Sequence, residues 1–282
     1  MIGGGPAGVE LAQVVQRFGG SGVVIEAAER LVAREPAPLG DALAEALHGD
    51  GLELVLGRQA IAARHEGEMY VLELDNGQVL SGDRVLVAAG RRPRVEGIGL
   101  DTVGVTATRQ GIPVDARLRA AQRLWAIGDV TGLWPLTHMG EYQGEVVASN
   151  ILGEERDAHY EAVPRVTYTD PQAAAVGATE AMFSGTARLA DVPKTATYTH
   201  AYAESNGFLT LLSDGAILTG AYALGPEAGE WLQQATVAIR ARVPLDVLRD
   251  TVQPFPSFSE IFGAALKALR RELAAPRRQT VA

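Results

Sequence analysis

The chain has 282 residues, of which 47% are hydrophobic and 21% charged, a composition typical of a globular protein with about two modest domains. Its net charge of −9, without a basic patch, argues against nucleic acid or an anionic membrane surface as a partner. No run of about 18 apolar residues occurs, and the first residues lack the apolar core of a secretion signal, so we expect a cytoplasmic protein without a membrane span. The absence of cysteine excludes disulfides, thiolate–metal sites and a cysteine nucleophile within these residues, and we predict no metal site.

The first third of the chain alternates between patterns typical of buried strands and of amphipathic helices. In chain order, the expected elements are a helix after a glycine-rich turn at 3–8, a strand at 23–26, a helix at 38–48, a strand at 52–56, an antiparallel excursion over 58–81 with a hairpin at 75–77, and a buried strand at 83–90. Leu11, Val15 and Phe18 recur at helical spacing along the first helix. This order predicts a doubly wound α/β unit.

The rest of the chain changes character at Pro164. The expected elements are a buried strand at 124–129, a helix from Gly140 to Leu152, three β-type runs near 196–223, a helix at 226–241 and a last helix from 258. The elements after Pro164 predict a separate α+β domain.

The glycine-rich turn at 3–8 fits the pattern GxGxxG. In such a turn the first glycine permits the sharp bend, the second lets the backbone approach a pyrophosphate, and the third lets the helix pack closely on the strand. The N–H groups and the positive dipole end of the following helix attract phosphates. Gly3, Gly5, Pro6, Ala7 and Gly8 therefore predict a dinucleotide-binding turn, with a purely structural turn as the alternative.

An acidic residue ends the next predicted strand. Glu26 lies 18 positions after Gly8, close to the spacing of a carboxylate that binds the ribose of a dinucleotide. Such a carboxylate accepts hydrogen bonds from a free ribose 2′-OH and repels a 2′-phosphate, so NAD is favoured over NADP. Nearby Arg30 weakens this preference, and the alternative is that Glu26 is merely solvated.

Two further acids have open interpretations. Glu10, expected in the first helical turn, either complements the helix dipole or acts near the nicotinamide. Asp129 follows a predicted strand and a glycine, where it could hold a sugar-like hydroxyl, or serve only as a loop acid or helix cap.

Six segments taken together carry a family resemblance. GGGPAGVELA, VVIEAAERL, VLVAAGRRP, LWAIGDV, LTHMGEYQGEVVASNI and PRVTYTDPQAAAVGATE resemble the pyridine nucleotide–disulfide oxidoreductases, which include dihydrolipoamide dehydrogenase and mercuric reductase. The resemblance runs in order from residue 1 to about residue 270. It implies FAD bound beside NAD(P)H, hydride transfer from nicotinamide to flavin, and a homodimer.

The resemblance also implies roles for individual residues. Asp129 would hydrogen-bond the FAD ribityl chain, and Gly90 would belong to the cofactor site. Thr137 and His138 would lie under the flavin pyrimidine ring, at a helix N-terminus that stabilises negative charge on the reduced ring. His138 by itself is more typical of a packed or capping histidine than of a proton donor.

The sequence departs from the family near its end. Phe255 stands where disulfide-reducing members carry the acid–base histidine, so no catalytic residue is assigned. The family's glutamate is present as Glu260, but Ser257 and Glu260 also form a capping box in front of an apolar helix face. The buried face of that helix is expected to carry Phe262, Leu266 and Leu269.

We therefore predict an α/β protein with an NAD domain at 1–93, the trailing part of an FAD domain at 94–163 and a dimerisation domain at 164–282. Its expected activity is FAD-dependent oxidation of NADH with a quinone or another small electron acceptor. One alternative is a disulfide reductase whose cysteine pair lies in a missing N-terminal part. The other is a non-catalytic module that binds NAD or dimerises.

The start of the chain carries one more expectation. Only Met1 and Ile2 precede Gly3, so the first parallel strand is expected to be nearly absent, leaving a gap in the sheet. Unpaired buried backbone groups each cost about 1–3 kcal/mol. The 282-residue chain is therefore expected to fold poorly and to hold FAD at less than one per chain.

Overall fold

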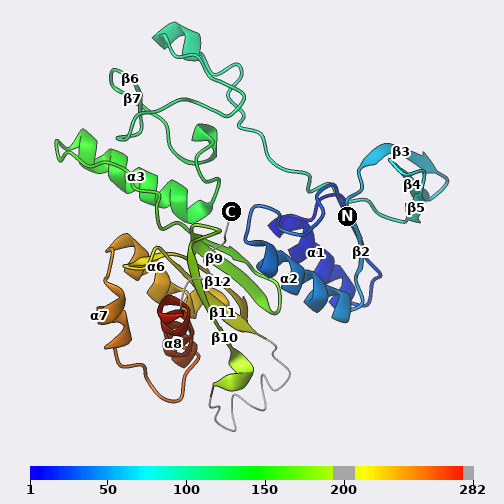
Figure 1. Cartoon of the computed structure of the whole chain (residues 1–282). Helices are drawn as coiled ribbons and strands as arrows, with labels where there is room; N and C mark the ends of the chain where they lie inside the picture. The colour runs from blue at the N-terminus through cyan, green and yellow to red at the C-terminus, as the bar shows by residue number, and fades with distance from the viewer. Residues whose placement is uncertain (193–206, 276–282) are drawn as a thin grey trace, which may run out of the picture. The chain divides into compact units, whose positions relative to one another are not determined.

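The computed structural model describes residues 1–192 and 207–275, and its chain forms two compact units (Figure 1). The first unit comprises Met1–Ala89 and Glu161–Ala282, and the second comprises Gly90–Tyr160. The first of the three β-type runs expected near 196–223 lies largely outside the described residues.

The amino-terminal part of the first unit has the α/β alternation that its sequence predicts. Its elements are α1 (Pro6–Arg17), β1 (Val23–Glu26), α2 (Ala37–Gly49), β2 (Glu53–Leu56), β3 (Ala60–Glu66), β4 (Met69–Leu74) and β5 (Val79–Gly82). Strands β1 and β2 pair in parallel, whereas β3, β4 and β5 form the antiparallel excursion. The hairpin predicted at 75–77 is confirmed, since the Gly77 N–H donates to Leu74 O at 2.9 Å and Gly77 has φ +82.

Met1 to Gly3 are paired on both sides, so the gap expected at the start of the sheet is wrong for these residues. The Ile25 N–H donates to Met1 O and the Gly3 N–H to Ile25 O, at 2.9 and 2.8 Å. On the other side the Ile2 N–H donates to Leu86 O at 2.8 Å. Ile2 thus bridges both neighbouring segments through isolated parallel bridges, to Ile25 and to Val87.

The buried strand predicted at 83–90 is not found. This segment makes only an isolated parallel bridge, between Val87 and Ile2, and Val87 is 70% exposed. An apolar run is buried only where other elements cover both of its faces, which the run of residues alone does not specify.

The apolar residues that recur at helical spacing along α1 do not form its buried face. Leu11 and Val15 are exposed, and Phe18, just after the helix, is 89% exposed. The buried face instead carries Gly8, Val9, Ala12 and Gln13. Small side chains allow close packing, and the polar Gln13 can be buried because its amide accepts from the Asp170 N–H and donates to Asp170 O, both at 2.8 Å.

The carboxyl-terminal part of the first unit is an antiparallel sheet with the strand order β10-β11-β12-β9-β8. Its elements are β8 (Pro164–Thr167), β9 (Gln172–Gly177), β10 (Phe183–Arg188), β11 (Phe208–Ser213), β12 (Leu218–Gly225), α5 (Ala228–Trp231), α6 (Gln233–Arg240), α7 (Leu245–Arg249) and α8 (Glu260–Ala274). The helix predicted at 226–241 is thus divided into α5 and α6.

The two faces of this sheet have different neighbours. Helices α5, α6 and α8 pack on one face around a core that includes Leu209, Leu211 and Phe262. The other face places Ala173 and Tyr222 in one core with α1 and α2 of the amino-terminal part. The two sequence-distant parts of the first unit therefore share a hydrophobic core.

The second unit has little regular structure. It contains the short helices η1 (Leu100–Val103) and η2 (Gly128–Thr131), the strands β6 (Arg119–Ala121) and β7 (Leu124–Trp125), and helix α3 (Thr137–Ile151). The buried strand predicted at 124–129 is wrong, because β7 is a two-residue partner of β6 and Gly128, with φ +73, turns the chain into η2. Helix α3 begins at Thr137, before the predicted Gly140.

Candidate functional site

The three glycines of the turn at 3–8 have different surroundings. A Cβ atom on Gly3, which has φ +110, would overlap the carbonyl oxygen of Ala88, and one on Gly8 would overlap the carbonyl oxygen of Gly3. A Cβ atom on Gly5 would meet no atom of the described chain within 4 Å. The turn is therefore tightly packed at Gly3 and Gly8 and open at Gly5, where a ligand could approach the backbone.

The N-terminus of α1 adjoins this opening. Gly5 is the N-cap, Pro6 follows it, and no side chain of the described residues caps the helix. Pro6 and Ala7 are exposed. Uncapped N–H groups and the positive end of the helix dipole suit an anion such as a pyrophosphate.

Glu26 is held beside the turn by the backbone. One carboxylate oxygen accepts from the Gly4 N–H at 2.6 Å, and the other accepts from the Ala28 N–H at 2.8 Å. Glu26 is half-buried, so it is not merely solvated. An ionised carboxylate can accept about four hydrogen bonds, which leaves capacity for a ligand hydroxyl.

Glu10 has a partner that its local sequence does not indicate. It lies beyond the first turn of α1, which contains no acidic residue, so the dipole interpretation is wrong. Its carboxylate accepts from the Tyr168 N–H at 2.7 Å. Because Tyr168 lies 158 positions away, no local pattern could have identified this contact.

Asp129 lies in the second unit, in η2. Its carboxylate pairs with Arg91 at 3.1 Å, and the two side chains are 53% and 66% exposed. Arg91 also donates to Pro135 O at 2.6 Å. No local pattern singles out Arg91 as the partner of Asp129, which lies 38 positions away.

The turn before Asp129 is supported by a buried amide. The Gln143 side chain, which is fully buried, accepts from the Gly128 N–H at 2.6 Å and donates to the Tyr160 hydroxyl at 3.1 Å. Burial of this phenol raises the pKa of Tyr160. Gln143 and Tyr160 therefore fix the backbone next to Asp129, and sequence reasoning missed both.

Three further residues predicted at the cofactor sites also lie in the second unit. Thr137 and His138 are exposed in the first turn of α3, whose N-cap Leu136 offers no side-chain cap. Gly90 is exposed and has φ +119. The uncapped N-terminus of α3 is compatible with a negatively charged group.

The segment before α8 contains Phe255, which is 71% exposed. Glu260 accepts from the Ser257 N–H at 3.3 Å, whereas the Ser257 hydroxyl donates to Pro254 O. Helix α8 begins at Glu260 with Ser259 as its N-cap and no side-chain cap, so Ser257 and Glu260 do not form the predicted capping box.

The predicted buried face of the last helix is confirmed. Phe262, Leu266 and Leu269 are 2%, 3% and 1% exposed and belong to the core beneath the antiparallel sheet. These three side chains are therefore buried within the first unit and do not offer a dimer surface.

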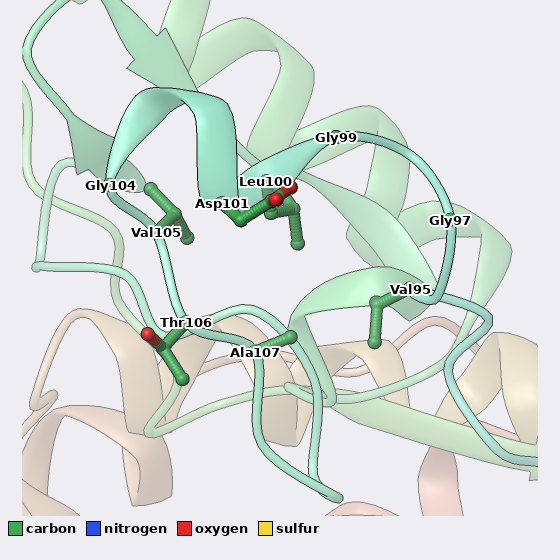
Figure 2. Close-up of a pocket in the computed structure, with 9 residues that line it drawn as sticks. All are labelled: Val95, Gly97, Gly99, Leu100, Asp101, Gly104, Val105, Thr106 and Ala107. Atoms are coloured by element: carbon green, nitrogen blue, oxygen red, sulfur yellow. The ribbon is translucent and has the colours of Figure 1, made fainter.

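A pocket of about 460 Å³ lies in the second unit and is not part of the candidate site (Figure 2). Its lining residues all come from one short segment that includes η1: Val95, Gly97, Gly99, Leu100, Asp101, Gly104, Val105, Thr106 and Ala107. None of the predicted site residues lines it. Within the described ranges, no cluster of three or more His, Asp or Glu residues could hold a metal ion, and no helix is long and apolar enough to cross a membrane.

Two family models match the chain. Residues 1–144 match the family model of the pyridine nucleotide-disulphide oxidoreductases, and residues 163–266 match the dimerisation domain of the same proteins. The chain belongs to the pyridine nucleotide-disulphide oxidoreductase family, a family of FAD-dependent flavoprotein oxidoreductases.

Individual relatives agree with this assignment. The chain is 33% identical to the dihydrolipoyl dehydrogenase of Chlamydia muridarum over 98% of its own length and 61% of the relative's. It is 32% identical to the mercuric reductase of Streptomyces lividans, over 97% and 60%. The chain thus spans about three fifths of the length of these curated relatives.

Solved structures show the same fold. The HOCl-induced flavoprotein disulfide reductase RclA of Escherichia coli matches 94% of this chain and 63% of its own, with 26% identity and a TM-score of 0.84. LpdA of Mycobacterium tuberculosis matches 94% of this chain and 60% of its own, with 24% identity and a TM-score of 0.83, a likeness of fold alone.

Proposed function

We propose that this protein takes part in FAD-dependent oxidation of NADH, with residues 1–93 binding NAD, 94–163 contacting the flavin and 164–282 forming a dimer. The observation that carries the proposal is the open backbone at Gly5, which lies between the uncapped N-terminus of α1 and the fixed carboxylate of Glu26. When bound, nicotinamide and flavin supply the redox chemistry, and the residues of the chain bind and orient them.

On the nucleotide side, Gly3, Gly5 and Gly8 shape the turn, with Pro6 and Ala7 opening the helix that receives the pyrophosphate. Glu26 accepts the ribose 2′-OH and repels a 2′-phosphate, which makes NADH the preferred nucleotide. Arg30 donates to Ala33 O at 3.4 Å within its own loop, which weakens it as a competing ligand for a 2′-phosphate. Glu10 contributes by anchoring α1 through Tyr168 rather than by contacting the nicotinamide.

On the flavin side, Asp129 accepts a ribityl hydroxyl by exchanging its exposed ion pair with Arg91. Thr137 and His138 present the N-terminus of α3 to the flavin, where the helix dipole stabilises negative charge. Gly90, within 1–93, is proposed only as a residue of the cofactor site, where its φ of +119 requires glycine.

The proposed electron acceptor is a quinone or another small molecule rather than a dithiol. Phe255 cannot exchange a proton, and general acid–base help is typically worth about 10²–10⁴-fold in rate. Glu260 is engaged with the Ser257 N–H, which favours a local structural role over a catalytic one.

The dimer is proposed to be a homodimer formed through 164–282, the part that overlaps the family's dimerisation domain. Exposed large apolar side chains of this part are Tyr168, Met182, Val237, Val247, Val252 and Phe255. Sedimentation at micromolar concentration should give twice the mass of one chain, and a folded monomer would contradict the proposal.

The test of the activity is NADH oxidation by the full-length protein with FAD bound, using a quinone, a redox dye and lipoamide in parallel. We expect turnover with the quinone and the dye, and turnover with lipoamide that is lower by about 10²–10⁴-fold. Comparable turnover of lipoamide would instead identify a disulfide reductase. NADH binding without turnover of any acceptor would favour a non-catalytic nucleotide-binding module.

A further inference from the structure

The loop between β1 and α2 forms one wall of the glycine turn. The Val32 N–H donates to Gly4 O at 2.9 Å. A Cβ atom on Gly4 would lie 2.7 Å from Cδ2 of Leu31, so the Leu31 side chain packs directly on the turn. Leu31 and Val32 are 0% and 4% exposed. The shape of the candidate nucleotide site therefore depends on where this loop is held.

The backbone of this loop is strained at Val32. Val32 has φ +42, a left-handed conformation that is unfavourable for a β-branched residue. Such a conformation persists only where the surrounding contacts enforce it, and strained residues concentrate at functional sites. Without an anchor, the loop would relax toward an ordinary backbone conformation and Gly4 O would lose its donor.

Glu35 and Arg165 supply that anchor. The Glu35 N–H donates to Val32 O at 2.8 Å. The Glu35 carboxylate accepts two parallel hydrogen bonds from the Arg165 guanidinium. They run from Nε to Oε1 and from Nη2 to Oε2, and both are 2.9 Å long. The two side chains are only 15% and 13% exposed, and they lie 130 positions apart in the chain. A fork-shaped pair of this kind fixes orientation as well as distance.

We propose that Arg165, on strand β8 of the part matched by the dimerisation domain, is a positioning residue for dinucleotide binding. Acting through Glu35, it holds the loop in the strained conformation that places Leu31 and Val32 against the glycine turn. This inference rests on the proposed function of that turn. It makes part of the carboxyl-terminal domain a component of nucleotide recognition, although Arg165 itself touches no nucleotide.

The test compares Arg165→Gln and Arg165→Lys with the wild-type chain. Lysine keeps the charge but cannot form the fork. The matched control is Arg240→Gln, which removes an exposed pair with Glu161 in the same unit, with side chains 53% and 46% exposed. Each variant is titrated with NADH, and its thermal midpoint and the hydrogen exchange of the amides at 31–35 are measured without nucleotide.

Arg165→Gln should weaken NADH binding on the order of tenfold at temperatures well below its midpoint. Arg165→Lys preserves the charge and the fold, and its NADH affinity should lie between those of wild type and Arg165→Gln. Its amides at 31–35 should exchange hydrogen faster than those of wild type. Arg240→Gln should match wild type in its NADH affinity and in the hydrogen exchange of the amides at 31–35. A folded Arg165→Lys chain with unchanged loop exchange and unchanged NADH affinity would overturn the inference. A wild-type chain that binds no NADH would overturn the proposed nucleotide site as well.

Discussion

The two candidate cofactor regions of the molecule hold their key carboxylates in different ways. Glu26, in the first unit, is fixed by two backbone N–H groups beside a turn in which Gly3 and Gly8 leave no room for a side chain. Asp129, in the second unit, is held by one exposed arginine. The first region is preorganised by backbone packing and the second by an exchangeable surface contact, so nucleotide binding should be much more robust than flavin binding.

Among the proposed substitutions, Gly8→Ala should cause the largest loss of folding stability. The added methyl group would overlap Gly3 O at a contact between two backbone segments, neither of which can move aside easily. We expect destabilisation of about 3 kcal/mol or more, measured by urea unfolding. Gly49→Ala, at the end of α2, is the matched control, because its Cβ atom would meet none of the described atoms within 4 Å. Equal stability of the two variants would show that the turn is not tightly packed.

Gly5→Ala should separate binding from folding. Gly5 has φ −77, which alanine adopts readily, and its Cβ atom would point into open space. The thermal midpoint should stay close to that of wild type, whereas NADH affinity should fall on the order of tenfold, about 1.4 kcal/mol. Unchanged affinity in a titration would mean that no ligand approaches the turn at Gly5.

Glu26→Arg should alter nucleotide choice. Wild type should prefer NADH over NADPH, and the variant should narrow or reverse that preference, because a 2′-phosphate then meets a positive charge in place of a negative one. Affinities for both nucleotides measured side by side check this. Equal affinity of the unmutated chain for NADH and NADPH would remove the proposed role of Glu26.

The chain should bind FAD more weakly than it binds NADH. Asp129, Thr137 and His138 are all exposed, so we expect the chain, mixed with FAD and desalted, to retain less than one flavin per chain. The flavin absorbance near 450 nm, roughly, measures the amount retained. A cooperatively melting yellow protein with one flavin per chain would contradict the comparison.

The smallest effect concerns a turn outside both cofactor regions. The N–H groups of Ile217 and Ala216 donate to Asp214 and lower the pKa of that carboxyl below its ordinary value of 3.8. Because the folded-state pKa is the lower one, this stabilisation is present above pH 3.8 and is lost as the pH falls through the folded-state value. Asp214→Asn should therefore be less stable than wild type near neutral pH, by on the order of 0.5 kcal/mol for an exposed group. The difference should shrink in acid, and NADH affinity should not change.

Local patterns predicted the nucleotide region well, because its geometry is encoded over short distances. The glycine turn at 3–8, the strand that Glu26 ends and the helix at 38–48 follow from residue types and spacing within one segment. The roles of Gly5 and Glu26 in NAD binding stay predictions, and the open backbone at Gly5 and the fixed carboxylate of Glu26 are compatible with those roles.

Contacts between distant segments could not be predicted from such patterns. The buried face of α1 does not follow from local spacing, because one of its partners, Asp170, lies far along the chain. The same is true of the pairs formed by Glu10 with Tyr168 and by Glu35 with Arg165. The strand predicted at 124–129 was wrong for another reason. Periodicity alone does not distinguish a buried strand from a short hairpin followed by a turn.

The most direct test of the nucleotide site is a calorimetric titration of the 282-residue chain with NADH. The open backbone at Gly5, the uncapped helix α1 and the fixed Glu26 predict saturable binding of one NADH per chain, weakened in Gly5→Ala without loss of folding. A folded chain that shows no saturable binding of NADH would contradict the account.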